Sequence, residues 1–392
     1  MTEPRKVQSK RSEIDDEIRK AVMEQLEEPI HYRGKQTYFF ESEFANYVGT
    51  KYAVSVNSGT SAMLAGMAAM GVGRGDEVII PANAYISSVE VPVFLGATPV
   101  FCDVDPDIAN ATLETVQAKV TPRTKVIAVT HMYGHPVDMD PILDLARERD
   151  IGVLEVSPHA LGAEYKGKKA GQLGDVAIFS FGGKNIFVGS TGGMLTTNDE
   201  TLFDQAAAVA IHGWVRKPID SSYFDSVKFA ESSTDGRFPL EDPVVRPGLN
   251  LQMGEIMARI GRITLGRVER WNTRRNEIAK LYTDLIGDAG IPVKVPVVKE
   301  WAKHAFLHYV IQVKERDALV SWLEDNNIEP KVHYPIPLPE EQYYRENYPT
   351  DPDEYPTARR LANEIITLPM HPWLEEEDVR AVVDAMVGFF NQ

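Results

Sequence analysis

The chain has 392 residues, of which 43% are hydrophobic and 25% charged, as is usual for a soluble globular protein of about two domains. Its formal net charge of -16 argues against a nucleic-acid partner or an anionic membrane surface. The single cysteine, Cys102, excludes an intrachain disulfide, and the nine histidines show no metal-ligand spacing, so we expect no metal. No run reaches the ~18 apolar residues of a membrane span, and residues 1–13 lack the apolar stretch of a signal peptide, so we expect a cytoplasmic protein.

Short apolar runs alternate with helical patterns over the first half of the chain. We expect strands at residues 52–56, 77–80, 99–102, 125–130, 152–156, 176–181 and 193–197. This alternation predicts a mostly parallel sheet covered by helices on both faces. Functional residues in such a sheet gather beyond the carboxyl ends of the strands.

The second half of the chain has a different pattern. Residues 210–248 are irregular, and we interpret them as a long excursion, either a lid or an oligomer contact. One long helix with an arginine-rich polar face is expected over 254–285, and residues 308–392 predict a smaller α/β unit that ends in an amphipathic helix over 375–390. We therefore divide the chain into an N-terminal arm and helix (1–30), a large domain (31–250), and a linking helix with a small C-terminal domain (251–392).

Two local patterns point to chemistry. The segment 57–62, NSGTSA, opens a helix directly after a strand, where free backbone amides and hydroxyls bind phosphate. An ordinary helix cap by Ser58 or Thr60 explains the same residues. Lys184 follows a strand pattern and two glycines, and an amine desolvated in a cleft forms a Schiff base with an aldehyde. Although a solvated lysine in a turn is the alternative, a phosphate site beside a reactive lysine is what pyridoxal phosphate requires.

Ordered motifs extend this interpretation over residues 32–389. They are FESEFA at 40–45, SGTSA at 58–62, GDEVI at 75–79, GATPV at 96–100, HMYG at 131–134, HALGA at 159–163, FSF at 179–181 with Lys184, and LP at 368–369. With these motifs the chain resembles the DegT/DnrJ/StrS sugar aminotransferase family. The resemblance implies a three-layer, mostly parallel α/β sheet of the aspartate-aminotransferase type, fold type I, with a smaller C-terminal α/β domain and pyridoxal 5'-phosphate as cofactor.

The resemblance also implies roles for single residues. By this resemblance Lys184 is the Schiff-base lysine and proton shuttle. The phosphate is held by Gly59, Thr60, Ser61 and Ser180, joined by Asn250 from a second subunit of a homodimer with shared active sites. Tyr85 stacks on the ring, His159 contacts the ring hydroxyl, and His333 and Tyr334 lie at the mouth of the cleft near the substrate. From the residues alone, Tyr85 is equally a packed loop aromatic, His159 a hydrogen-bonded core histidine, and the His333 segment a structural element.

The chain departs from the family pattern at three places. Val156 stands where the family has an aspartate that pairs with the pyridine nitrogen, so the ring is a weaker electron sink. Glu155 is able to replace that aspartate only through a bulge or a shifted register, because neighbouring strand residues face opposite sides. The segment 189–193, GSTGG, lacks a family glutamate, and Leu251-Gln252 stands where the family commonly has Tyr-Arg.

These residues predict a pyridoxal phosphate aminotransferase. The acceptor is expected to be a keto sugar, sugar nucleotide or cyclitol of secondary-metabolite or cell-surface sugar biosynthesis, and the amino donor glutamate or glutamine. Because of Val156, two alternatives stay open. The same fold and cofactor could support elimination, epimerisation or oxidation, or the chain could be a cofactor-binding homologue without turnover.

Overall fold

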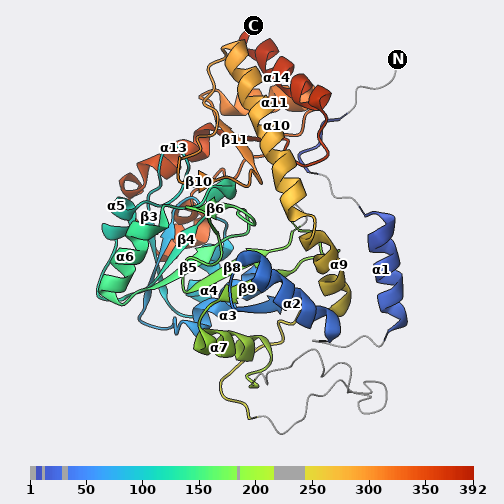
Figure 1. The fold of residues 1–392 in the computed structure, drawn as a ribbon. Coiled ribbons are helices and arrows are strands. Elements are labelled where there is room, and N and C mark those ends of the chain that lie inside the picture. The colour runs from blue at the N-terminus through green and yellow to red at the C-terminus, as the bar shows by residue number, and fades with distance from the viewer. Residues whose placement is uncertain (1–5, 11–13, 29–33, 183–185, 216–242) are drawn as a thin grey trace.

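A computed structural model describes residues 6–10, 14–28, 34–182, 186–215 and 243–392 (Figure 1). Lys184, the first residues of the N-terminal arm and most of the expected excursion at 210–248 lie outside these described residues. Among the helices that the structure describes, none is long and apolar enough to cross a membrane.

The centre of the molecule is a seven-stranded sheet with the order β1-β9-β8-β5-β4-β2-β3. The strands are β1 (Tyr52–Val56), β2 (Glu77–Pro81), β3 (Thr98–Cys102), β4 (Thr124–Thr130), β5 (Gly152–Val156), β8 (Val176–Ser180) and β9 (Gly193–Thr197). Strand β9 runs antiparallel to both of its neighbours, and the other pairs are parallel. All the strands predicted between residues 52 and 197 are therefore confirmed.

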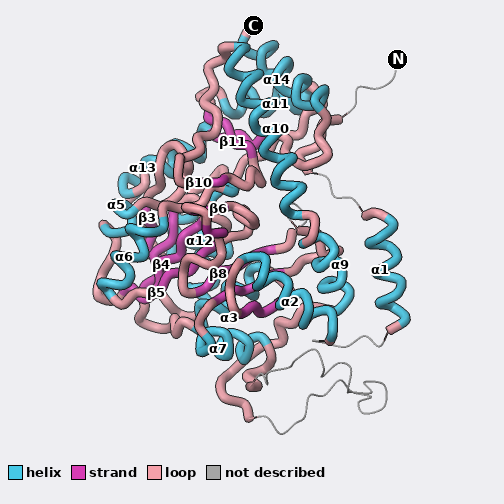
Figure 2. The backbone as a smooth tube through the Cα atoms, in the orientation of Figure 1, coloured by secondary structure: helices cyan, strands magenta, loops and turns pink. Residues whose placement is uncertain are grey.

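Helices cover both faces of this sheet (Figures 1 and 2). On β4, Val126 and Ala128 pack into the core with α3 (Gly59–Ala69), α4 (Ser87–Phe94) and α7 (Glu200–Ala210). The intervening Ile127 and Val129 pack on the opposite face, which is covered by α2 (Lys35–Val48), α5 (Leu113–Gln117), α6 (Met139–Arg149) and α9 (Glu255–Leu265). Because strand residues alternate between faces, strands with apolar residues at successive positions bury both faces and produce the expected three layers.

The C-terminal part forms a second, smaller core. A two-stranded antiparallel sheet of β11 (Tyr309–Gln312) and β12 (Ile365–Leu368) packs with α10 (Val268–Ala289), α11 (Arg316–Asp325) and α14 (Glu376–Phe390). The smaller α/β unit and its terminal amphipathic helix were both predicted. The remaining elements are β6 (Glu164–Tyr165), β7 (Lys168–Lys169), β10 (Ala302–Lys303), α12 (Gln342–Asn347), α13 (Pro356–Glu364) and three short 3-10 turns, Met132–Gly134, Leu338–Glu340 and Pro352–Glu354.

The single helix expected over 254–285 is wrong, because the chain breaks into α9 and α10 between Leu265 and Val268. The break falls at Gly266, and glycine is a poor helix former, whereas the hydrophobic periodicity continues across it. The arginine-rich face is also not simply solvated. Arg259 and Arg267 form ion pairs with α1 (Asp16–Glu27) and its N-cap, which lie beside α9 in Figure 1, and Arg275 is buried.

Candidate active site

A cavity of about 270 Å³ opens where the carboxyl ends of β4, β5 and β8 meet the N-terminus of α3. It is lined by Lys10, Gly59, Thr60, Tyr85, Ser87, Thr130, Val156, Pro158, His159, Ile178, Ser180, Gly182, Leu307, His308, His333 and Tyr334. The structure thus brings together most of the residues that the sequence singled out. Ser61 and Asn250 do not line the cavity, and Lys184 lies outside the described residues.

One end of the cavity is rich in hydroxyls and amides. Ser58 caps α3 by accepting a hydrogen bond from the Ser61 amide at 3.1 Å, so the ordinary capping role is present. The next two residues, Gly59 and Thr60, line the cavity, and their amides have no acceptor among the described residues. The cap therefore leaves the amides of Gly59 and Thr60 available at a helix N-terminus, a position that favours an anion.

The close approach of α3 to β8 requires glycine at position 59. A Cβ atom on Gly59 would lie 2.5 Å from the Ser180 Cβ. This contact brings the Ser180 hydroxyl to the same end of the cavity as the Thr60 side chain. The hydroxyl of Ser61 is instead turned into the cap, because it donates to Asn57 Oδ1 at 2.6 Å.

The floor of the cavity is a row of three residues on adjacent parallel strands. Thr130 at the end of β4 is in register with Val156 on β5, and Val156 is in register with Ile178 on β8. Residues in register on neighbouring strands point to the same face, and all three line the cavity. Val156 is 3% exposed, so this part of the site is apolar apart from the threonine hydroxyl.

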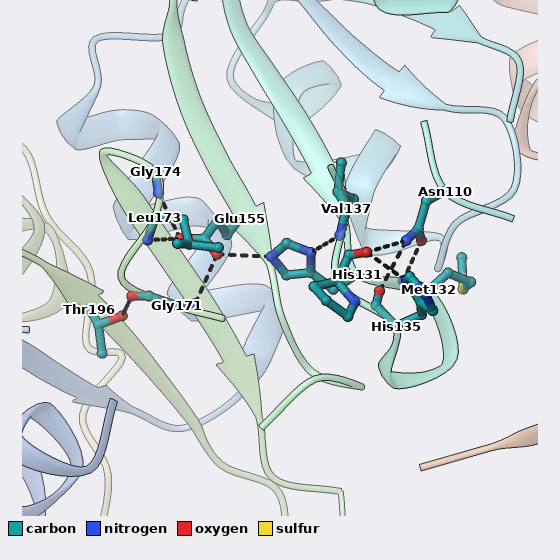
Figure 3. A network of polar contacts seen from close by, with 11 residues as sticks. Asn110, His131, Met132, His135, Val137, Glu155, Gly171, Leu173, Gly174 and Thr196 are labelled. Atoms are coloured by element: carbon teal, nitrogen blue, oxygen red, sulfur yellow. Dashed lines mark hydrogen bonds and ion pairs between the residues drawn. The ribbon is translucent and has the colours of Figure 1, made fainter. Parts of the chain in front are cut away.

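Glu155 precedes Val156 on β5 and therefore faces the other side of the sheet, where Figure 3 shows it beside His131 and residues 171–174. Its carboxylate is fully buried and accepts hydrogen bonds from the amides of Gly171, Leu173 and Gly174 at 2.8, 2.7 and 2.8 Å. A fourth partner is His131 Nε2 at 2.8 Å. The carboxylate therefore fixes the loop before β8 and is fully engaged there.

The protonation of His131 follows from its second contact. His131 Nδ1 accepts a hydrogen bond from the Val137 amide at 2.9 Å, so the ring proton of Nε2 is the one donated to Glu155. The register of β5 is regular against both of its neighbours, without the bulge that would turn Glu155 toward the cavity. The alternative in which Glu155 replaces the missing aspartate is therefore wrong.

Aromatic side chains form the rim. The Tyr85 ring is 55% exposed and lies 6.0 Å, centroid to centroid, from the ring of Tyr334, whose burial raises the pKa of its hydroxyl. His308 stands between two predicted histidines, with its ring 4.7 Å from that of His159 and 4.2 Å from that of His333. Tyr85 is thus an exposed aromatic at the cavity rather than a packed loop residue.

Tyr133 ties two parts of this rim together. Its amide donates to His159 Nδ1 at 3.3 Å, and its hydroxyl donates to the His333 carbonyl at 2.7 Å. His159 Nδ1 is thus an acceptor for the backbone of the rim. The hydrogen-bonded histidine and the cavity-lining histidine are therefore one and the same residue.

Several lining residues were not predicted. Lys10 reaches the cavity because the N-terminal segment pairs with the C-terminal part, through the bridge between Val7 and Ile328 and a hydrogen bond from the Ser9 amide to Glu329. The charged N-terminal sequence contains no pattern that would have predicted Lys10 at the cavity. Thr130 is different, since it ends a predicted strand, and the rule that sites lie beyond strand carboxyl ends points to it.

Two further observations bound the site. Asn250 is exposed and carries its own contact, in which its Oδ1 accepts a hydrogen bond from Gln252 Nε2 at 3.2 Å. Within the described part of the chain, no group of three or more His, Cys, Asp or Glu side chains is arranged to hold a metal ion.

The strand carboxyl ends of a sheet covered by helices on both faces meet a helix N-terminus at this cavity, which is the place where α/β proteins commonly bind their ligands. Residues 12–387 match the family model described as the DegT/DnrJ/EryC1/StrS aminotransferase family, and the chain belongs to this family.

Relatives with assigned activities share nearly the whole length of the chain. It is 35% identical to a GDP-perosamine synthase from Caulobacter vibrioides, with 88% of each chain covered. It is 34% identical to a dTDP-3-amino-3,6-dideoxy-alpha-D-galactopyranose transaminase from Aneurinibacillus thermoaerophilus, with 94% of each covered. The structure of DesV from S. venezuelae in complex with a ketimine intermediate is similar with a TM-score of 0.85 and 29% identity, over 96% of this chain and 95% of that one. This likeness confirms the predicted sheet of fold type I.

Proposed function

We propose that this protein is a pyridoxal phosphate-dependent aminotransferase that acts on a keto sugar, a sugar nucleotide or a cyclitol. The observation that carries the proposal is the cavity itself, because Gly59, Thr60 and Ser180 line it together with Tyr85, His159, His333 and Tyr334. The family relationship supports the reaction class, and the activities of the relatives support a sugar nucleotide as the acceptor.

The cavity fits the cofactor at its polar end. The amides of Gly59 and Thr60 and the hydroxyls of Thr60 and Ser180 offer a set of donors for a phosphate dianion at a helix N-terminus. Tyr85 at the rim offers a ring face, and His159 lines the same cavity and would lie near the ring hydroxyl. The apolar floor at Val156 lacks the carboxylate that usually pairs with the ring nitrogen.

Lys184 is proposed as the covalent anchor. It follows Gly182, a residue that lines the cavity, by two positions along the chain. When bound, the cofactor supplies an aldehyde and an electron sink for amino transfer. The amine of Lys184 would hold the aldehyde and, once an amino donor has replaced it, would carry the proton between carbon atoms. We propose glutamate or glutamine as that donor.

The proposal includes a homodimer in which Asn250 completes the phosphate site of the partner subunit. The support is that Asn250 is exposed and absent from the cavity of its own chain. Mixing Lys184→Ala and Asn250→Ala subunits tests this, because a shared site predicts that the mixed dimer regains one intact site. Mixtures no more active than the separate variants would contradict it.

The apolar floor gives specific support to a second candidate function. Because Val156 and Ile178 offer no carboxylate to the cofactor, elimination, epimerisation or oxidation on the same cofactor is the alternative to amino transfer. The two differ in their products. Amino transfer leaves the cofactor aminated after glutamate has reacted, whereas the alternatives return it as the aldehyde.

Absorbance spectroscopy of the purified protein tests the main proposal. The protein loaded with pyridoxal phosphate should absorb as a Schiff base near the visible edge, and glutamate should convert this band to that of the pyridoxamine form. Lys184→Ala is the control and should lose the Schiff-base band. Failure to bind the cofactor, or a band that survives in Lys184→Ala, would overturn the proposal.

A further inference from the structure

Thr130 carries an unexplained polar group in the proposed cofactor cavity. Its side chain is 6% exposed, and its Oγ1 atom is buried with no hydrogen-bond partner among the described residues. Buried hydroxyls are nearly always hydrogen-bonded, so an unpartnered one calls for an explanation. Of the described residues with such an atom, Thr130 is the one that also lines the cavity.

The position of Thr130 relative to Val156 is fixed by the sheet. The two residues are in register on β4 and β5, and adjacent strands lie about 4.8 Å apart. Ile178 continues the row on the other side of Val156. The hydroxyl of Thr130 is therefore the polar atom of an otherwise apolar floor.

The geometry of the ligand decides which of its atoms meets this floor. In pyridoxal phosphate the aldehyde and the ring nitrogen occupy opposite corners of the ring, and the phosphate arm is next to the aldehyde. Phosphate at Gly59, Thr60 and Ser180 with the aldehyde at Lys184 directs the nitrogen away from that end, toward the strand row. This step rests on the proposed function.

We infer that the Thr130 hydroxyl donates a hydrogen bond to the ring nitrogen, so that this protein binds pyridoxal phosphate with the nitrogen unprotonated. A hydroxyl is a far weaker acid than a pyridinium, so the proton stays on the Thr130 oxygen. The methyl groups of Val156 and Ile178 desolvate the site and disfavour a positive charge there. Glu155, the nearest carboxylate along the strand, is engaged on the other face.

This inference is tested, without an activity assay, by comparing two ligands in the wild type and in a Thr130 variant. Binding of pyridoxal phosphate and of its 1-deaza analogue, in which C–H replaces the ring nitrogen, is measured by titrating the cofactor-free protein. The wild type should prefer pyridoxal phosphate by about tenfold, the value of one good hydrogen bond. Thr130→Val, which has the same shape without the hydroxyl, should reduce the preference to about twofold or less.

Thr130→Ser is the matched control because it keeps the hydroxyl, and it should keep the preference. Unchanged binding of the deaza analogue by Thr130→Val shows that the variant is folded, and loss of the preference then supports the inference. A second measurement is the nitrogen chemical shift of bound ¹⁵N-labelled pyridoxal phosphate, expected in the range of an unprotonated pyridine in the wild type. Val156→Asp should move it to the pyridinium range.

The outcomes separate the inference from the proposal on which it rests. A wild type that forms the Schiff base but shows a pyridinium shift, or the same preference in Thr130→Val as in the wild type, overturns the inference alone. A wild type that binds neither ligand overturns the proposed function and the inference together.

Discussion

Glu155 and Val156 are neighbours on one strand, yet they meet opposite surroundings. Glu155 lies in a polar network on the far face, where four donors satisfy a fully buried carboxylate (Figure 3). Val156 lies on the cavity floor among apolar atoms and one hydroxyl without a partner. The acidic residue of this strand thus stabilises the fold, and the neighbouring position, which faces the cavity, carries no charge.

Removing the carboxylate of Glu155 should have the largest effect. Glu155→Ala leaves three backbone amides and the His131 N–H buried without an acceptor, which should lower the free energy of unfolding by about 3–5 kcal/mol. Urea denaturation followed by circular dichroism measures this. Val156→Ala is the matched variant and should cost only about 1–2 kcal/mol, from lost burial. Equal costs for the two would contradict the assignment of a structural role to Glu155.

Acid should destabilise the turn after β4, where His135 is buried, but not the cavity floor, where Thr130, Val156 and Ile178 do not titrate. Burial lowers the pKa of His135 to about 4, and the neutral ring contacts the Pro136 carbonyl through Nδ1 and accepts from the Lys299 amide through Nε2. Between pH 6.5 and 4 the unfolded chain therefore binds a proton that the folded one does not. The stabilisation, full above pH 6.5, should be lost as pH falls, by up to about 3 kcal/mol.

His135→Gln is the control for this pH dependence. Glutamine is able to donate and accept hydrogen bonds but does not titrate, so the variant should lose less stability between pH 6.5 and 4. Part of the loss should remain, because burial also lowers the pKa of His304. The free energy of unfolding is measured at several pH values for the wild type and for His135→Gln. An identical pH dependence of the two proteins would show that His135 does not contribute.

Substituting Val156 by aspartate places a carboxylate on the cavity floor, so that positions 155 and 156 would both be acidic. Val156→Asp is expected to pair with a protonated ring nitrogen and to raise the rate of half-transamination with glutamate by about tenfold, or 1.4 kcal/mol. Val156→Asn has a similar shape without the charge and should give no such gain. A rate that does not rise, together with loss of a native reaction, would favour altered chemistry over a weakened aminotransferase.

The strands and the helix start at residues 57–62 were predictable because their signals are local. Alternation of apolar runs located each strand of the central sheet, and the turn at 57–62 follows from its small and hydroxyl-bearing residues. The break at Gly266 was missed because periodicity continues through it. Lys10 was missed because its place depends on pairing between residues 7 and 328, a contact that no local pattern encodes.

For Glu155, the sequence predicts which face of the sheet the side chain points to, but not which residues it contacts. The period of two in a strand predicted correctly that Glu155 and Val156 face opposite sides, given a regular register. The donors that occupy Glu155 come from residues 171–174 and from His131, and only the folded chain brings them together. The roles of Lys184 and Asn250 stay predictions.

Tyr133 links the part of the cavity at His159 to the part at His333. Its backbone adopts the left-handed conformation, with φ of 60°, and from that position it holds His159 through its amide and the His333 carbonyl through its hydroxyl. A shift of the segment at residues 333 and 334 is therefore transmitted to the ring of His159. Substitutions at His159 and at His333 or Tyr334 should therefore be non-additive, and a substitution at residue 333 or 334 alone should also change the affinity for pyridoxal phosphate.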